Sequence, residues 1–188
     1  MISPILIIID MKFQHLYSIT GEPGTGKTSI GNYIAESFKY KHVDLEDEST
    51  RSKFLNNFAT TIDELIASGE NIIVTWGFEP YLEFDGVALL KEKGFKIIWF
   101  DGDRKAAYQE YIRREEEKYN RDKKLGISPF TSLEECLKIH KEAYDAQIKK
   151  IDESDIVKKL NPVKINSFNI EGKFRGKKEI ANDILSLC

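Results

Sequence analysis

A glycine-rich segment near the start of the chain constrains the fold more strongly than any other part of the sequence. Residues 21–28 read Gly-Glu-Pro-Gly-Thr-Gly-Lys-Thr, which matches the phosphate-binding pattern G-x-x-x-x-G-K-[ST] at every fixed position. Residues 13–20 precede it and predict a buried strand. Apolar side chains follow it at helical spacing, namely Ile30, Tyr33, Ile34 and Phe38. The sequence therefore predicts a strand, a tight loop and a helix in direct succession, the context in which this pattern holds phosphate.

The chemistry expected of this segment is the binding of a nucleoside triphosphate. Glycines allow the backbone to curl so that successive N–H groups point at one anion, and the helix N-terminus adds its positive end. Lys27 is expected to reach the β- and γ-phosphates, and the Thr28 hydroxyl to hold Mg²⁺. ATP and Mg²⁺ are therefore the expected cofactors, and an ordinary turn before a helix is the alternative. The candidate nucleotide-binding residues are Gly21, Glu22, Pro23, Gly24, Thr25, Gly26, Lys27, Thr28 and Ser29.

Length and composition indicate one globular domain spanning residues 1–188. Hydrophobic residues make up 41% and charged residues 31%, a balance typical of globular rather than disordered or fibrous proteins. The formal net charge of −3 argues against general nucleic-acid binding, so no nucleic-acid partner is expected. The two cysteines, Cys136 and Cys188, have no metal-binding spacing, and a reducing cytoplasmic location is expected.

The first ten residues hold an apolar run, residues 5–9, which is followed by Asp10. A run of this length is too short to span a bilayer, which needs ~20 residues, so no membrane partner is expected. It also lacks the basic start and the small-residue cleavage site of a signal peptide. Residues 1–10 are expected to be an added edge strand or a start-site extension. The run imitates a strand that ends in a metal-binding aspartate, but it precedes the glycine-rich loop, which is the wrong chain order for that role.

The remainder of the chain alternates between strand and helix patterns. Strands are expected at residues 41–45, 71–76, 95–100 and 163–170. Helices are expected at residues 61–69, 87–90, 103–112, 131–151 and 180–185. A capping-box pattern at Thr61 opens the first of these helices, and residues 113–126 are densely charged without a period. This alternation predicts an α/β class, three-layer αβα P-loop NTPase fold with a five-stranded parallel sheet and a helical lid insertion at about residues 104–150.

Three classes of protein use such a loop: switch GTPases, mechanical ATPases and kinases of small molecules. A GTPase carries an Asn-Lys-x-Asp segment that reads guanine, and this sequence has none. A mechanical ATPase carries four apolar residues that end in Asp-Glu, whereas the nearest match, residues 97–101, is followed by Gly102. The pattern therefore favours a kinase, and an ATP-binding regulatory module without kinase activity is the alternative.

The chain resembles the adenylate, shikimate and gluconate kinase group of P-loop small-molecule kinases over most of its length. The form Gly-x-Pro-Gly-x-Gly-Lys at residues 21–27 is similar to the loop common in that group. Residues 72–77 are similar to the third strand of shikimate kinases, although only Gly77 of its terminal glycine run is present. Residues 145–147, Asp-Ala-Gln, are similar to a segment after the lid of gluconate kinases. The resemblance implies an ATP- and Mg²⁺-dependent kinase whose small-molecule acceptor is a nucleotide, a nucleoside or a polar metabolite.

The candidate catalytic residues are Lys27, Asp44, Arg113 and Arg114. Asp44 follows the apolar core of the second expected strand, so in a parallel sheet it shares a crevice with the loop and is expected to hold metal or orient the acceptor. The resemblance points the same way, because shikimate-type kinases hold metal and substrate with acids at this place. The alternative is a solvated acidic turn, with Asp101 as the fallback carboxylate.

Arginine is scarce in this chain, with six against twenty-two lysines, and Arg113, Arg114 and Arg121 fall in the charged stretch. A guanidinium grips phosphate with two bonds, which an ammonium group does not do. We expect a mobile lid whose Arg113 or Arg114 closes over the triphosphate. Three glutamates follow at residues 115–117, so salt bridges at the end of a helix are the alternative.

Three further features each have two interpretations. Trp76, Phe78 and Tyr81 either stack on a planar substrate or form a buried aromatic plug. In kinases of the resembling group, the loop after the last strand borders the adenine, which implies that position for residues 173–175 instead of a plain basic turn. Lysines at positions 149, 150, 158, 159, 164, 173, 177 and 178 motivate a nucleic-acid end kinase as a further alternative, although acidic residues interleave with them.

Overall fold

The computed structural model describes residues 14–77, 84–153 and 155–187, which contain one parallel sheet. The strand order is β2-β3-β1-β4-β5. The strands are β1 (Leu16–Gly21), β2 (Lys41–Asp44), β3 (Ile72–Thr75), β4 (Lys96–Asp101) and β5 (Val163–Asn166). The predicted five-stranded parallel sheet is therefore confirmed, although the last strand ends at Asn166 rather than at residue 170.

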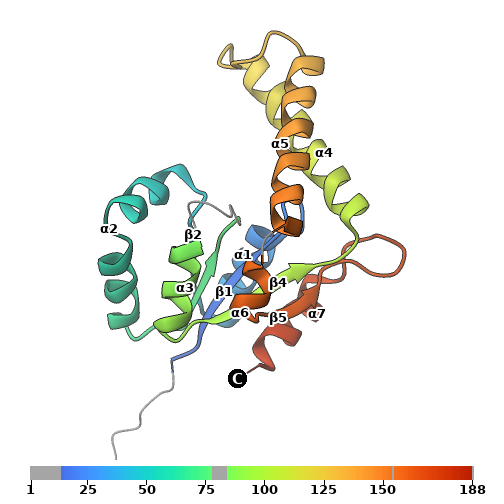
Figure 1. Cartoon of the computed structure of the whole chain (residues 1–188). Coiled ribbons are helices and arrows are strands. Elements are labelled where there is room, and N and C mark those ends of the chain that lie inside the picture. The colour runs from blue at the N-terminus through green and yellow to red at the C-terminus, as the bar shows by residue number, and fades with distance from the viewer. Residues whose placement is uncertain (1–13, 78–83, 154, 188) are drawn as a thin grey trace, which may run out of the picture.

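Helices cover both faces of the sheet, as the three-layer prediction requires (Figure 1). The helices of the body are α1 (Lys27–Phe38), α2 (Glu48–Ala67), α3 (Phe84–Glu92), α6 (Ile156–Leu160) and α7 (Lys177–Leu185). On the face of α1 and α7, the buried side chains include Ile19, Ile34, Ile98 and Ile184. On the face of α2, α3 and α6, they include Ile62, Val74, Leu90, Trp99 and Leu160. Burial on both faces explains why β3 and β4 contain continuous apolar runs, whereas the edge strands β2 and β5 are partly exposed and more polar.

The loop after β1 lies where the strand order reverses. β1 is central, and it pairs with β3 on one side and with β4 on the other. Ile19 pairs with Thr75, and Gly21 pairs with Phe100, so residues 22–26 leave the sheet between the ends of these two neighbours. Open α/β sheets bind ligands in the crevice outside such a reversal. The fold therefore positions the glycine-rich loop where a ligand is expected.

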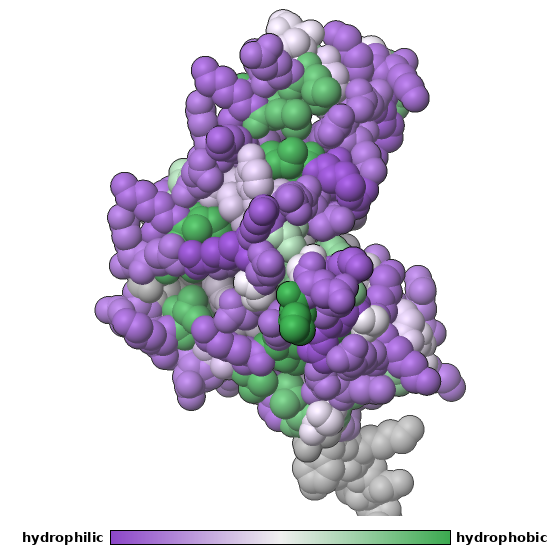
Figure 2. All heavy atoms as spheres, turned by 90° about the vertical axis from the view of Figure 1, so that its right-hand side faces the viewer, coloured by the Kyte–Doolittle hydropathy of each residue, from purple (hydrophilic) through white to green (hydrophobic). Residues whose placement is uncertain are grey.

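Two long helices, α4 (Arg104–Lys124) and α5 (Leu133–Glu153), project from the body as a hairpin (Figure 1). Asp103 caps α4 by accepting the N–H groups of Lys105 and Ala106. The charged residues 113–126 are helical as far as Lys124, because Glu115 and Tyr119 give α4 a buried side one turn apart. We call residues 104–153 the lid, and they contain the predicted helical insertion. Figure 2 shows that hydrophilic side chains dominate the visible surface of lid and body.

One predicted helix start is wrong. The capping-box pattern at Thr61 lies inside α2, which begins at Glu48, and the Thr61 hydroxyl donates to the Asn57 carbonyl. The true cap is Asp47, whose side chain accepts the Ser49 N–H. Asn57 has φ −145° and ψ 50°, so α2 is kinked there. The kink explains why the capping-box pattern at Thr61 predicted a new helix where the second half of a longer helix continues.

No helix within the described residues is long and apolar enough to cross a membrane. The prediction of an edge strand or extension at residues 1–10 lies outside the described residues.

Candidate active site

The glycine-rich loop has the backbone geometry of an anion cradle. Gly24 has φ 77° and Gly26 has φ 81°, left-handed values that suit glycine. Among the described residues, the N–H groups of both glycines have no acceptor in the protein. Helix α1 begins at Lys27, and its first turn has no acidic residue and no side-chain cap. The N–H groups at the positive end of α1 therefore remain available to bind an anion in the loop.

The loop lies directly against the first turns of α4. A Cβ atom added at Gly24 would be 2.0 Å from the carbonyl oxygen of Ala107, and one at Gly26 would be 3.1 Å from the Phe174 ring. Side chains at these two positions would displace α4 or the aromatic ring. The glycines thus serve both the curl of the loop and its contact with the lid.

Lys27 is held inside the loop in the absence of phosphate. Its side chain is buried, and Nζ donates to the carbonyl oxygens of Gly21 at 3.2 Å and Glu22 at 2.9 Å. Burial lowers the pKa of Lys27, and the nearby Glu46 carboxylate acts in the opposite direction. The ammonium group can move from these carbonyls to a phosphate without leaving the loop. Its predicted role at the β- and γ-phosphates stays a prediction.

The structure brings Thr28 and Asp44 together. The Thr28 hydroxyl, exposed on the first turn of α1, donates to Asp44 Oδ2 at 2.8 Å, and Asp44 Oδ1 accepts the Glu46 N–H at 3.0 Å. Asp44 is the last residue of β2, so the sheet and α1 supply one oxygen ligand each. A hydroxyl and a carboxylate fit Mg²⁺, which takes oxygen ligands and keeps several waters. Metal binding by this pair stays a prediction.

A cavity of 440 Å³ lies between the loop, the lid and the segment before α7. The loop side contributes residues 23–30, which leaves Gly21 and Glu22 outside the lining although both were candidate binding residues. The other lining residues are Glu46, Gly77, Glu110, Tyr111, Arg113, Arg114, Gln147, Phe174, Arg175, Lys177 and Ile180. The cavity therefore joins the loop to both predicted lid arginines.

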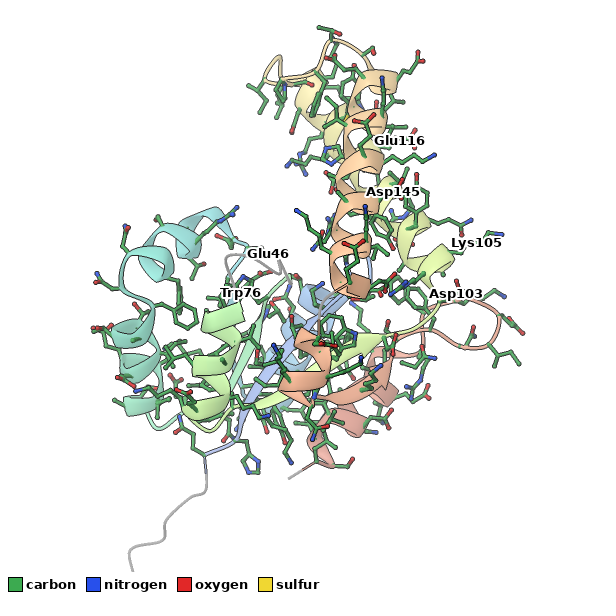
Figure 3. The ribbon with its side chains drawn as sticks, viewed as in Figure 1. Glu46, Trp76, Asp103, Lys105, Glu116 and Asp145 are labelled. Carbon is green, nitrogen blue, oxygen red and sulfur yellow. The ribbon has the colours of Figure 1, made fainter. Side chains whose placement is uncertain are left out.

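Glu46 was passed over at the sequence level in favour of Asp44, yet it is Glu46 that lines the cavity. A Cβ atom at Gly77 would be 1.8 Å from Glu46 Oε1, so the carboxylate lies flat against the backbone at the end of β3. Figure 3 shows Glu46 at the carboxyl edge of the sheet, above Trp76. No described residue hydrogen-bonds to the Glu46 side chain. In the sequence, the glycine at position 77 was the one sign that another group packs closely against the backbone there.

The two lid arginines differ in how they are held. Arg113 is exposed and pairs with Glu110 at 2.7 Å and Glu117 at 2.5 Å, both on its own helix. Arg114 donates to the buried Glu115 at 2.9 Å. Its guanidinium also lies over the Tyr111 ring, 5.4 Å from the centroid. These arginines therefore line the cavity and also form salt bridges along α4. Their closing over a triphosphate stays a prediction.

Tyr111 connects the cavity to the interior of the lid. Its hydroxyl lies 3.0 Å from Nδ1 of His140 on α5. Burial, with the Glu115 carboxylate adding to it, raises the pKa of Tyr111 to about 12, so the phenol stays protonated at neutral pH. The ring therefore offers an uncharged platform under Arg114.

Two other candidates have structural roles. Trp76 is buried and stacks on Phe58 with centroids 5.4 Å apart, which supports the aromatic plug; Phe78 and Tyr81 lie outside the described residues. Asp101, the fallback carboxylate, accepts the Gly102 N–H and pairs with Lys164, so it shapes the turn after β4.

The loop after β5 supplies an aromatic ring that the sequence did not single out. Phe174 stacks on Phe168 with centroids 4.5 Å apart, and its ring lies beside Gly26 while 43% of the residue stays exposed. Arg175 is held by the Asn166 carbonyl and by acids of α7. The signal available in the sequence was an aromatic between two basic residues, in the segment implied to border adenine.

Comparisons with known proteins agree with this geometry. No protein-family model matches the chain. A shikimate kinase from Caldicellulosiruptor bescii is 30% identical over 44% of this chain and 55% of its own length, so the match spans about half of that relative.

Solved structures align over nearly the whole chain. A sugar kinase from Janibacter sp. HTCC2649 has a TM-score of 0.53 at 12% identity, covering 92% of this chain and 93% of its own. A shikimate kinase from Acinetobacter baumannii in complex with shikimate has 0.51 at 14%, covering 94% and 93%. A gluconokinase from Sinorhizobium meliloti 1021 has 0.50 at 17%, covering 93% and 91%.

The chain has the fold of the P-loop small-molecule kinases. This confirms, at the level of the fold, the resemblance inferred from residues 21–27, 72–77 and 145–147. Identities of 12–17% establish a shared fold. A shared fold does not determine the reaction, which depends on the residues of the site.

Proposed function

We propose that this protein is an ATP- and Mg²⁺-dependent phosphotransferase that moves a γ-phosphoryl group to a small acceptor. The observation that carries the proposal is the open N-terminus of α1. There the inward glycine amides, the Lys27 ammonium and the lid arginines all face one cavity. Phosphoryl transfer needs little covalent help from the protein, because positioning and charge neutralisation supply most of the rate.

The phosphate end of the site uses the loop. Lys27 would leave the Gly21 and Glu22 carbonyls to neutralise the β- and γ-phosphates, while the loop amides hold their oxygens. Thr28 and Asp44 would hold Mg²⁺, which when bound neutralises the phosphate charge that develops during transfer. Phe174 offers an exposed ring face beside Gly26 for the purine of the nucleotide.

The acceptor end of the site is best assigned to Glu46. The sequence assigned Asp44 both to the metal and to the acceptor, whereas the geometry supports dividing these tasks. Asp44 is engaged with Thr28, and Glu46, two residues further along the same turn, lines the cavity. A carboxylate there can accept the hydrogen of an acceptor hydroxyl and orient its oxygen toward the γ-phosphate. Arg114 would cover the transferring group from the lid.

The nucleic-acid alternative receives little support from the lysines that motivated it. Four of them pair with neighbouring acids: Lys149 with Glu153, Lys158 with Asp155, Lys164 with Asp101, and Lys173 with Glu171. Paired lysines leave a weak net field for a phosphate backbone. A nucleic-acid substrate would nevertheless be recognised by strong salt dependence of oligonucleotide binding.

The test is an ATP-consumption screen with Mg²⁺ across nucleosides, nucleoside monophosphates and sugar acids. Stimulation by one compound is expected, and Lys27→Ala should abolish it. Lys41→Ala is the matched control, because Lys41 lies at the opposite end of β2 and pairs with Glu70. Slow hydrolysis that no compound stimulates would instead indicate a regulatory module. The cytoplasmic location stays a prediction.

A further inference from the structure

One arginine joins the P-loop to both helices of the lid. Arg104 Nε donates to Glu22 Oε1 at 2.8 Å, and its two terminal nitrogens donate to the Asp152 carboxylate at 2.8 and 2.6 Å. Glu22 belongs to the loop, Arg104 is the first residue of α4, and Asp152 is next to last in α5. We call Glu22, Arg104 and Asp152 the Arg104 clasp.

Glu22 is an unexpected residue for a phosphate-binding loop. Its side chain is 4% exposed and does not line the cavity. A carboxylate near phosphates weakens anion binding unless a cation neutralises it. A buried carboxylate also lowers stability when it has no partner. Burial raises the pKa of Glu22, and the Arg104 guanidinium opposes this shift. The Glu22 carboxylate is thus compatible with anion binding and with a stable fold only while the Arg104 guanidinium pairs with it.

The clasp lies at the base of the lid. Asp103 and Lys105, the neighbours of Arg104, are at the foot of α4 in Figure 3, where the hairpin leaves the body. The Tyr144 hydroxyl of α5 also donates to the Arg104 carbonyl oxygen at 3.4 Å. Arg114 lies ten residues further along α4, about 15 Å at 1.5 Å per residue. A small rotation at the foot therefore becomes a large displacement of Arg114 over the cavity.

We propose that Arg104 is a positioning residue that couples occupancy of the P-loop to the placement of the lid. The inference rests on the proposed function. When a triphosphate binds, Lys27 leaves the Glu22 carbonyl, and the peptide that carries the Glu22 side chain changes its hydrogen bonding. Arg104 passes that change to α4 through the Glu22 carboxylate and to α5 through Asp152. Arg104 does not line the cavity and acts through Arg114.

Hydrogen exchange with and without a non-hydrolysable ATP analogue and Mg²⁺ tests the coupling without any turnover. In the wild type, ligand should slow exchange at residues 21–29 and at residues 104–124. In Glu22→Gln/Arg104→Gln, which removes both charges and leaves no buried orphan, the loop should stay protected and the lid should lose its protection. Asp152→Asn breaks only the α5 side and should show a smaller loss in the lid. Lys149→Gln, a surface ion-pair variant on α5, should match the wild type.

The possible outcomes distinguish failure of the proposed role of Arg104 from failure of the proposed function. Equal lid protection in the wild type and the double variant would overturn the role of Arg104 while leaving the proposed function standing. No ligand protection at residues 21–29 of the wild type would overturn the proposed function, and this inference with it.

Steady-state kinetics then distinguish a residue that positions Arg114 from one that only stabilises the folded state. Glu22→Gln/Arg104→Gln should lower kcat by about 10²-fold, as misplacement of a catalytic group does, with the KM for ATP changed less than about threefold. In an Arg114→Ala background the same double substitution should cost less than about threefold, because residues that act through one another are not additive. Full additivity would contradict the proposal.

Discussion

The P-loop and the lid are built in different ways. The hydrogen bonds inside the loop join residues at most six positions apart, as in Lys27 to the Gly21 carbonyl and Thr25 to the Glu22 carbonyl. Contacts that hold the lid join residues far apart, such as Arg104 and Asp152, which are 48 positions apart. The difference teaches that the loop is a preformed local device, whereas the lid is placed by side chains from several elements.

The two regions also differ in how strongly they are held. Two positive-φ glycines in close contact with α4 and Phe174 fix the loop by sterics. Ion pairs with exposed partners, such as Arg113 with Glu117, contribute about 0–1 kcal/mol each. The loop is therefore fixed against the foot of α4, so closure over a triphosphate requires movement of the part of the lid beyond that contact.

The largest expected effect is that of removing the loop cation. Lys27→Ala should lower acceptor-stimulated turnover by about 10³-fold or more, because a preorganised charge next to the transferring group is lost. Its thermal midpoint should stay close to that of the wild type, since burial already works against the charged form of Lys27. Steady-state kinetics and a melting curve measure both. Parental turnover in this variant would show that the loop is not the site.

A pair of glycine substitutions sharpens the distinction between the crowded loop and open turns. Gly24→Ala should destabilise by about 2–5 kcal/mol, from the left-handed backbone and the clash with the Ala107 carbonyl. Gly69→Ala has nearly the same φ, 70°, but meets no atom within 4 Å, so it should cost only about 1–2 kcal/mol. Denaturant unfolding compares the two. Equal costs would mean that the loop yields to α4 more easily than its packing indicates.

The lid arginines should separate in kinetics. Arg114→Ala is expected to lower kcat by about 10²-fold, because Arg114 lines the cavity beside the loop and is the cation proposed to cover the transferring group. Arg113→Ala should lower it by less than about fivefold, since Arg113 is exposed and held by its own helix. Initial rates at saturating ATP test the pair. The reverse ranking would place the transferring group nearer the outer face of α4.

The smallest effect expected is a pH dependence carried by Glu22. Its pKa is raised in the folded state, so between the ordinary carboxylate range and that raised value the native state binds more protons than the unfolded state. Stability from this group is present at low pH and falls as the pH rises through the raised pKa. The difference in unfolding free energy, wild type minus Glu22→Gln, should therefore decrease with pH across this window. A difference that grows with pH would contradict the assigned burial.

The sequence predicted what local contacts determine. The loop and the alternation of five strands with helices depend largely on neighbours within a few positions, and both were predicted. The start of α2 was misplaced because the Asn57 kink left a capping-box pattern inside a helix.

The missed parts of the site depend on pairs distant in the chain. Glu46 lies over Gly77, 31 positions later, and Arg104 reaches Glu22 across 82 positions. The residues around each partner in a single sequence do not identify which distant residue it contacts. Asp44 and Glu46 are acids of one turn, and only the folded structure shows that Asp44 contacts Thr28 while Glu46 lines the cavity. The predicted role of Asp44 stays a prediction.

Calorimetric titration with Mg²⁺ and a non-hydrolysable ATP analogue tests the anion cradle most directly. The account predicts one site per chain, unchanged in Gly69→Ala and weakened by at least about 100-fold, or about 2.7 kcal/mol, in Gly24→Ala. Equal affinity in the two glycine variants, or no binding by the wild type, would contradict it.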